Sequence, residues 1–205
     1  MQVKSYLRPL TEAELYRALE RERAPVLFVA GATDILVQAR NGEPFRDRAA
    51  IDLTALPMLR EIREDEDYIY IGGTATHAEV AASQIVTAYA PVLAAAAAEI
   101  GAVQLRNRAT IGGNIVNASP AGDTLGPLAV LNAAVLLDCM GELRELPFID
   151  VISGSGKTAL RDREFLRAVR IPKLPNRFRW RFEKVGRRNA MSISRLTVSV
   201  VADVS

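Results

Sequence analysis

Residues 104–124 read QLRNRATIGGNIVNASPAGDT, and this stretch decides the fold that we expect of the chain. It holds few large apolar residues and no sustained hydrophobic period, which argues against an ordinary core helix or strand. Gly112 and Gly113 let the backbone approach a ligand closely because they lack a Cβ atom. Asn114 and Asp123 add amide and carboxylate groups suited to a polyhydroxylated ligand. A polar surface loop is the alternative for a glycine pair alone, but a stretch of this length favours a binding segment.

A second glycine turn lies upstream, between an apolar run and a helix. Residues 26–30 predict a short buried strand, and residues 35–38 lead into a helix. The turn between them contains Gly31 and Thr33. A strand, a glycine turn and a helix N-terminus can together bind a phosphate, because unpaired backbone N–H groups point outward there. A simple strand-to-helix connection is the alternative, and the turn by itself does not exclude it.

Both segments resemble FAD-binding segments of a known family. Residues 28–34 are similar to the first such segment of the molybdenum hydroxylases, the family of xanthine dehydrogenase and carbon monoxide dehydrogenase. Residues 106–123 are similar to the second segment. A third similarity lies downstream, in the strand that carries Lys184 and in residues 186–193. The resemblance therefore extends over nearly the whole chain, in the order that the family has.

The sequence departs from the family's pattern at two positions. Ala32 stands where the family often has a second glycine or an asparagine, which affects how tight the first turn can be. Ser192 stands where the family has the aspartate of an Asp-Ile pair, so that local interaction is not expected here.

The resemblance implies an α+β, bi-lobed FAD-binding fold of the PCMH type. Residues 1–55 would form a small α/β N-terminal lobe, and residues 56–175 a larger lobe with a mainly antiparallel sheet. Residues 176–205 would begin a C-terminal domain, which in the family is longer and looks truncated here. No Gly-x-Gly-x-x-Gly motif follows the first buried strand, so a Rossmann fold is not expected.

The same resemblance implies which residues bind FAD. The first segment would hold the pyrophosphate, and the second the phosphates, sugar or ribityl chain. The cofactor-binding residues expected from the family are Phe28, Val29, Ala30, Gly31, Ala32, Thr33, Asp34, Ile100, Gly101, Thr110, Gly112, Gly113, Asn114, Val116, Asp123, Leu166 and Lys184. No catalytic residue and no metal ligand is expected, because flavin chemistry resides in the cofactor.

The function implied is that of the FAD-binding electron-transfer subunit of a molybdenum hydroxylase. In this family a molybdopterin large subunit supplies electrons to the [2Fe–2S] clusters of a small subunit. The FAD-binding subunit takes the electrons from those clusters. It passes them to NAD⁺ or another acceptor. The alternative is a non-catalytic or truncated subunit that keeps the flavin fold for a regulatory or structural role.

Composition indicates which partners and which cellular compartment to expect. The chain has 205 residues, of which 49% are hydrophobic and 24% charged, and a net charge of +2. So small an excess of positive charge does not suggest a nucleic-acid partner. No apolar run is long enough for a membrane span, and no signal peptide is seen, so we expect a cytoplasmic protein. Cys139 is the single cysteine, which excludes an internal disulfide.

Two further motifs are expected to carry no chemistry. Residues 153–158 imitate a phosphate-binding P-loop, but Val151 stands where that motif requires a glycine. His77 is the only histidine, at a predicted helix start, and we expect a surface or capping role for it.

The C-terminal part predicts two long strands. Residues 177–185 alternate, with Phe178, Trp180 and Phe182 on one face, which predicts a core-facing strand. Residues 195–205 are rich in β-branched side chains and predict a second strand with an exposed edge. Self-association, or binding of partner subunits, is expected through this edge.

Hydrophobic periodicity also predicts the remaining elements. Helices are expected at 11–20, 80–83, 92–100 and 128–131, and strands at 49–53, 62, 68–71, 134–137 and 165–172.

Overall fold

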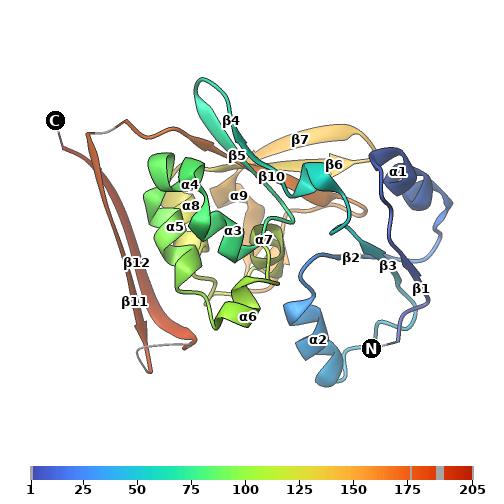
Figure 1. The fold of residues 1–205 in the computed structure, drawn as a ribbon. Coiled ribbons are helices and arrows are strands. Elements are labelled where there is room, and N and C mark those ends of the chain that lie inside the picture. The colour runs from blue at the N-terminus through green and yellow to red at the C-terminus, as the bar shows by residue number, and fades with distance from the viewer. Residues whose placement is uncertain (1, 176, 188–191, 205) are drawn as a thin grey trace.

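The fold has two lobes and a C-terminal hairpin, as Figure 1 shows. The computed structural model describes residues 2–175, 177–187 and 192–204. Within these residues the chain forms a three-stranded parallel sheet, a five-stranded antiparallel sheet and two two-stranded sheets. The expected α+β class, with a small parallel lobe and a larger antiparallel lobe, is confirmed.

The small lobe is a β–α–β–α–β unit. It contains β1 (Ser5–Leu7), α1 (Glu12–Arg21), β2 (Val26–Val29), α2 (Thr33–Arg40) and β3 (Ala49–Asp52). The strands lie in the order β1-β3-β2 and are parallel, because α1 and α2 return the chain to the same end of the sheet. The core of this lobe consists of Leu15, Leu19, Ile51, Leu53, Leu56, Leu59 and Phe165.

Three members of that core lie outside residues 1–55. Leu56 and Leu59 belong to the short 3₁₀ helix region around Pro57–Leu59, and Phe165 begins β10 (Phe165–Pro172). We propose that residues 1–55 and 56–175 are the two lobes and that these side chains join them.

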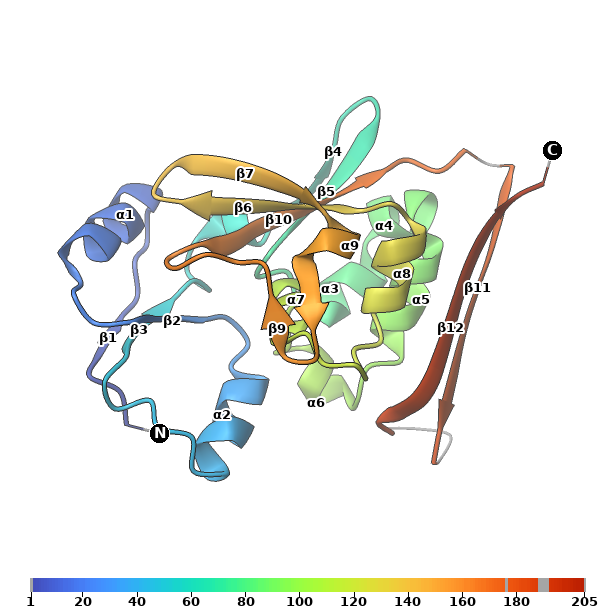
Figure 2. The same ribbon diagram turned by 180° about the vertical axis from the view of Figure 1, so that it is seen from behind.

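The large lobe is built on one antiparallel sheet. Its strand order is β4 (Ile62–Glu64), β5 (Tyr68–Gly72), β10, β6 (Ala134–Cys139) and β7 (Glu142–Pro147). Helices α3 (His77–Ala82), α4 (Gln84–Tyr89), α5 (Pro91–Ala98), α7 (Ile111–Asn117) and α8 (Leu125–Val130) gather on one face of this sheet, seen from both sides in Figures 1 and 2. Two shorter helices, α6 (Val103–Arg106) and α9 (Phe148–Val151), complete the lobe.

Alternate residues of the central strands point into the core between this sheet and its helices. Ile69 and Ile71 of β5, and Val169 and Ile171 of β10, are fully buried in one cluster. Ala94, Ala96 and Ala97 of α5 belong to the same cluster, since their small side chains let this helix lie close to its neighbours.

Part of the segment that opens the sequence analysis is helical, which corrects our expectation. Thr110 caps α7 by accepting a hydrogen bond from the Gly113 N–H at 3.0 Å. Ile111 and Ile115 are fully buried. The helix of seven residues is too short to show a hydrophobic period in the sequence, and the backbone of Gly73 holds it in place by accepting from the Gly112 N–H at 3.0 Å.

A polar cluster fixes the two lobes to each other. The Tyr16 hydroxyl on α1 donates to the buried Asp138 carboxylate on β6 at 2.8 Å. The Arg167 guanidinium on β10 contacts Asp138 at 2.6 Å and also reaches Glu12 on α1. Buried charges joined in this way hold one geometry, because breaking the cluster would leave a charge unpaired.

The C-terminal hairpin lies at the end of the molecule opposite the small lobe (Figures 1 and 2). It contains β11 (Phe178–Gly186) and β12 (Ser194–Asp203), which pair along their length and contact α5 and α8. Phe182 is buried as expected, but the Trp180 side chain is 43% exposed, so its expected core position is wrong. Ser199, near the middle of β12, lies against Gly126 of α8.

The P-loop-like residues form two short strands, β8 (Ile152–Gly154) and β9 (Lys157–Thr158). No helix follows them directly, whereas a P-loop leads into a helix.

Candidate functional site

A cleft of about 700 Å³ lies between the β2–α2 turn of the small lobe and α7 of the large lobe. Most of the residues expected to bind a cofactor come together in its walls. These are Phe28, Ala30, Gly31, Ala32, Thr33, Asp34, Ile100, Gly101, Thr110, Gly112, Gly113, Asn114, Val116, Asp123 and Leu166. Val29 and Lys184 are not among the lining residues. Val29 is buried in the small lobe.

The small-lobe wall is a tight turn into a helix. Ala32 is the N-cap of α2 and has a left-handed backbone, with φ of 60°. A Cβ atom on Gly31 would lie 2.1 Å from the Arg108 carbonyl oxygen of the large lobe. Gly31 therefore serves the contact between the lobes, and the N–H groups at the start of α2 are left to face the cleft.

The two glycines of α7 have different surroundings. A Cβ atom on Gly112 would lie 2.5 Å from the Gly73 carbonyl oxygen, so this glycine lets α7 pack against the large lobe. A Cβ atom on Gly113 would meet only the Thr110 hydroxyl, at 3.0 Å. Because the protein does not fill the space at Gly113, that space is open to a ligand.

A buried ion pair holds Asp123 in the wall of the cleft. Lys184 donates to Asp123 Oδ2 at 2.5 Å and to the Glu99 carbonyl at 3.1 Å. Both side chains are less than one tenth exposed. The other carboxylate oxygen, Asp123 Oδ1, has no hydrogen-bond partner among the described residues although it is buried. A buried carboxylate oxygen is strongly stabilised by a donor, so the site fits a ligand hydroxyl or N–H.

Two asparagines of α7 are held by neighbours. Asn114 Oδ1 accepts from the Thr124 hydroxyl at 2.6 Å. The Asn117 amide donates to Asp34 Oδ1 at 3.0 Å, which joins α7 to α2 across the cleft.

Sequence reasoning missed several residues of the cleft. Gly73, Thr74, His77, Glu164 and Phe165 belong to large-lobe elements that only the fold brings to this place. Ser192 and Ile193 also line it. Residues 188–191 of the arginine-rich turn lie outside the described residues.

The expectation for His77 is wrong. Its side chain is 1% exposed, and Thr76, not His77, caps α3. Burial lowers the pKa of the imidazole to about 4, so it is neutral at physiological pH. A helix start normally lies at the surface, but here the Thr76–Thr110 bridge places it beneath α7.

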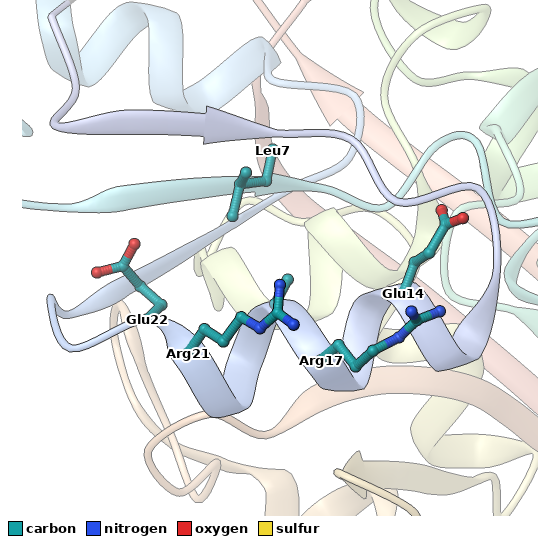
Figure 3. Close-up of a pocket in the computed structure, with 6 residues that line it drawn as sticks. Leu7, Glu14, Arg17, Arg21 and Glu22 are labelled. Carbon is teal, nitrogen blue, oxygen red and sulfur yellow. The ribbon is translucent and has the colours of Figure 1, made fainter.

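A smaller hollow of about 340 Å³ lies between α1 and β1 (Figure 3). Arg17 and Arg21 point into it from α1, near Glu14 and Glu22, with Leu7 opposite. Its charges balance and neither glycine segment reaches it, so we place no site there.

Metal-binding clusters and membrane-spanning helices are both absent from the described residues. No three histidine, cysteine, aspartate or glutamate side chains gather there to hold a metal ion. No helix in the same residues has the length and apolar character needed to cross a membrane.

Comparison with known proteins agrees with this geometry. Residues 1–174 match the family described as "FAD binding domain in molybdopterin dehydrogenase". The chain is 30% identical over 173 residues to the nicotinate dehydrogenase FAD-subunit of Eubacterium barkeri, covering 83% of this chain and 58% of that protein. It is 32% identical over 172 residues to the xanthine dehydrogenase FAD-binding subunit of Escherichia coli O157:H7, covering 83% and 58%.

A solved structure shows the same fold. Carbon monoxide dehydrogenase from Hydrogenophaga pseudoflava, in a form lacking the Mo-pyranopterin moiety, matches with a TM-score of 0.90 and 27% identity. The match covers 98% of this chain and 69% of that one. The chain thus spans somewhat under two thirds of the curated relatives named above. With the family match over most of its length, this chain belongs to the FAD-binding domains of the molybdopterin dehydrogenases, the molybdenum hydroxylases of the xanthine dehydrogenase and carbon monoxide dehydrogenase family.

Proposed function

We propose that the chain holds FAD in the cleft and serves as the flavin electron-transfer part of a molybdenum hydroxylase. The observation that carries this is the pairing of two features in the wall of one cleft: the open space at Gly113 and the buried Asp123 carboxylate oxygen without a donor. FAD offers the hydroxyl and N–H donors that such an oxygen requires, and it supplies the redox chemistry when bound.

The chain's own residues would bind and orient the cofactor. The N–H groups of the β2–α2 turn, with the Thr33 hydroxyl, would hold the pyrophosphate, since α2 presents its N-terminus to the cleft. Asp123 would accept from a sugar or ribityl hydroxyl. Lys184 would act through Asp123, because its ammonium holds Oδ2 and leaves Oδ1 facing the ligand.

We further propose the partners and the electron path. Relatives named as FAD-subunits and medium chains support assembly with a [2Fe–2S] small subunit and a molybdopterin large subunit. Electrons would come from the iron–sulfur clusters and leave to NAD⁺ or another acceptor. Co-purification with subunits encoded beside this chain, followed by reduction of the bound flavin by the partner's substrate, tests this path.

FAD uptake tests the site directly. Gly113→Val should abolish FAD binding while the fold is kept, because the new side chain enters the open space. Gly154→Val is the matched control, since its Cβ would meet only Lys157 carbons, at 4.0 Å, and Gly154 does not line the cleft. Flavin fluorescence titration and circular dichroism provide the two readouts.

Unchanged FAD affinity in the Gly113→Val protein would overturn the placement of the cofactor. A wild-type chain that is folded but takes up no FAD would overturn the proposed function and favour the non-catalytic alternative.

A further inference from the structure

The imidazole of His77 is a buried polar group for which neither the fold nor the comparisons give a role. His77 is the first residue of α3 and lines the cleft. Its side chain is 1% exposed, and Nδ1 has no hydrogen-bond partner among the described residues. Buried polar side-chain atoms are normally paired, so an unpaired one at the wall of a cleft needs an explanation.

The backbone holds His77 in this place. Its N–H donates to the Ala109 carbonyl at 3.0 Å, and the Ile111 N–H donates to the Ala75 carbonyl at 3.0 Å. Thr76 and Thr110 form an isolated antiparallel bridge between the same two segments. The start of α3 is therefore fixed to the start of α7, which holds the His77 backbone at the wall of the cleft.

The protonation state suits contact with a ligand. Burial lowers the pKa of His77 to about 4, so the ring is neutral and has one N–H donor and one nitrogen acceptor. A neutral imidazole can meet a hydroxyl, an amide N–H or a carbonyl without a charge being buried with the ligand. Asp123 Oδ1 is the second unpaired buried atom in the wall of the same cleft.

We propose that His77 is a ligand-contacting residue, whose Nδ1 forms a hydrogen bond with the flavin nucleotide in the cleft. This rests on the proposed function, since it names a contact for the same ligand. In the ligand-free chain the unpaired Nδ1 is unfavourable, and the ligand removes this cost on binding. Removal of the imidazole should therefore weaken FAD binding without destabilising the free chain.

Two substitutions separate the hydrogen bond from the shape of the side chain. His77→Leu fills a similar volume with no hydrogen-bonding group. His77→Asn places an amide atom at the position of Nδ1, because both are bonded to Cγ. We expect the dissociation constant for FAD to rise about tenfold in the leucine variant. In the asparagine variant it should stay within about threefold of the wild-type value. Fluorescence titration with FAD gives the dissociation constants.

The thermal unfolding of each FAD-free chain is the second readout. The leucine variant should be at least as stable as wild type, so affinity and free-chain stability change in opposite senses. Unchanged FAD affinity in a folded leucine variant would overturn the proposal while leaving the proposed function intact. Equal losses of affinity in both variants, or a loss that parallels a fall in free-chain stability, would show a packing role and overturn it as well. Absence of FAD binding by wild type would overturn the proposed function and the contact together.

Discussion

At the scale of single residues, glycines and their replacements decide the shape of the cleft. Gly31 and Gly112 serve contacts between backbones, whereas Gly113 faces open space, although the sequence presents all three alike. Ala32 keeps the left-handed backbone of a position where the family often has glycine. The resemblance identified the position, and only the dihedral angle shows that the turn is retained.

Ala32→Gly should stabilise the protein. A left-handed φ of 60° is unfavourable for alanine and free of steric cost for glycine, so we expect the free energy of unfolding to rise by about 1 kcal/mol. Urea unfolding measures this. Ala30→Gly in the same turn, where φ is not positive, should lower it by roughly 0.5–1 kcal/mol through chain entropy. Equal effects at both positions would contradict the argument.

His77 should make stability depend on pH. The unfolded imidazole titrates near 6.5 and the folded one at about 4, so between these values the unfolded state binds more protons. Stability from this group is present above pH 6.5 and is lost as pH falls towards 4, by on the order of 3 kcal/mol. Unfolding of wild type and His77→Leu, compared from pH 7 to 4.5, isolates this contribution. Parallel curves for the two proteins would contradict it.

At the scale of elements, the buried and the long strands were predictable, whereas some short or exposed strands and several helices were not. The expected strands at 26–30, 49–53, 68–71 and 165–172 correspond to β2, β3, β5 and β10, because buried strands are apolar over their whole length. The elements not predicted include β1, β7, β8, β9 and the short helices α4, α6 and α9, and α7 was taken for irregular structure. Helices of so few residues form through caps and tertiary contacts, which periodicity does not record.

The ion pair between β11 and the loop before α8 should be strongly stabilising as a pair. Lys184→Met leaves the buried Asp123 carboxylate unpaired, so we expect a loss of about 3–5 kcal/mol in the free energy of unfolding. Adding Asp123→Asn should restore much of it, because the uncompensated charge is removed. Denaturant unfolding of the two single variants and the double variant gives the coupling. Additive losses would show that the pair is not coupled.

At the scale of the whole molecule, the C-terminal hairpin is the least covered part. β12 pairs only with β11 among the described strands, and Leu196, Val198 and Val200 are 58%, 45% and 46% exposed. An open edge beside an apolar face commonly recruits another chain. Association through this hairpin therefore stays a prediction.

We expect the isolated chain to self-associate, and Val198→Lys with Val200→Glu to suppress it. The register places these positions opposite Glu183 and Arg181, so the new charges have cross-strand partners and the net charge is kept. Light scattering over a range of concentrations measures the mass. Leu143→Glu is the control: this side chain is 64% exposed and lies on β7, away from the hairpin, so the variant should still associate. A monomeric wild type at high concentration would contradict the expectation.

The sequence by itself determined the family, the two lobes and fifteen of the residues that line the cleft, because these depend on local signals: apolar runs, glycine turns and the order of two short segments. The tertiary structure alone decided what each of them does. It separated Gly113 from Gly112, placed Lys184 behind Asp123 and buried His77 in the cleft wall. Such roles depend on which backbone or side chain from a distant segment fills the neighbouring space. A single sequence does not record that, because close packing arises only when the whole chain has folded.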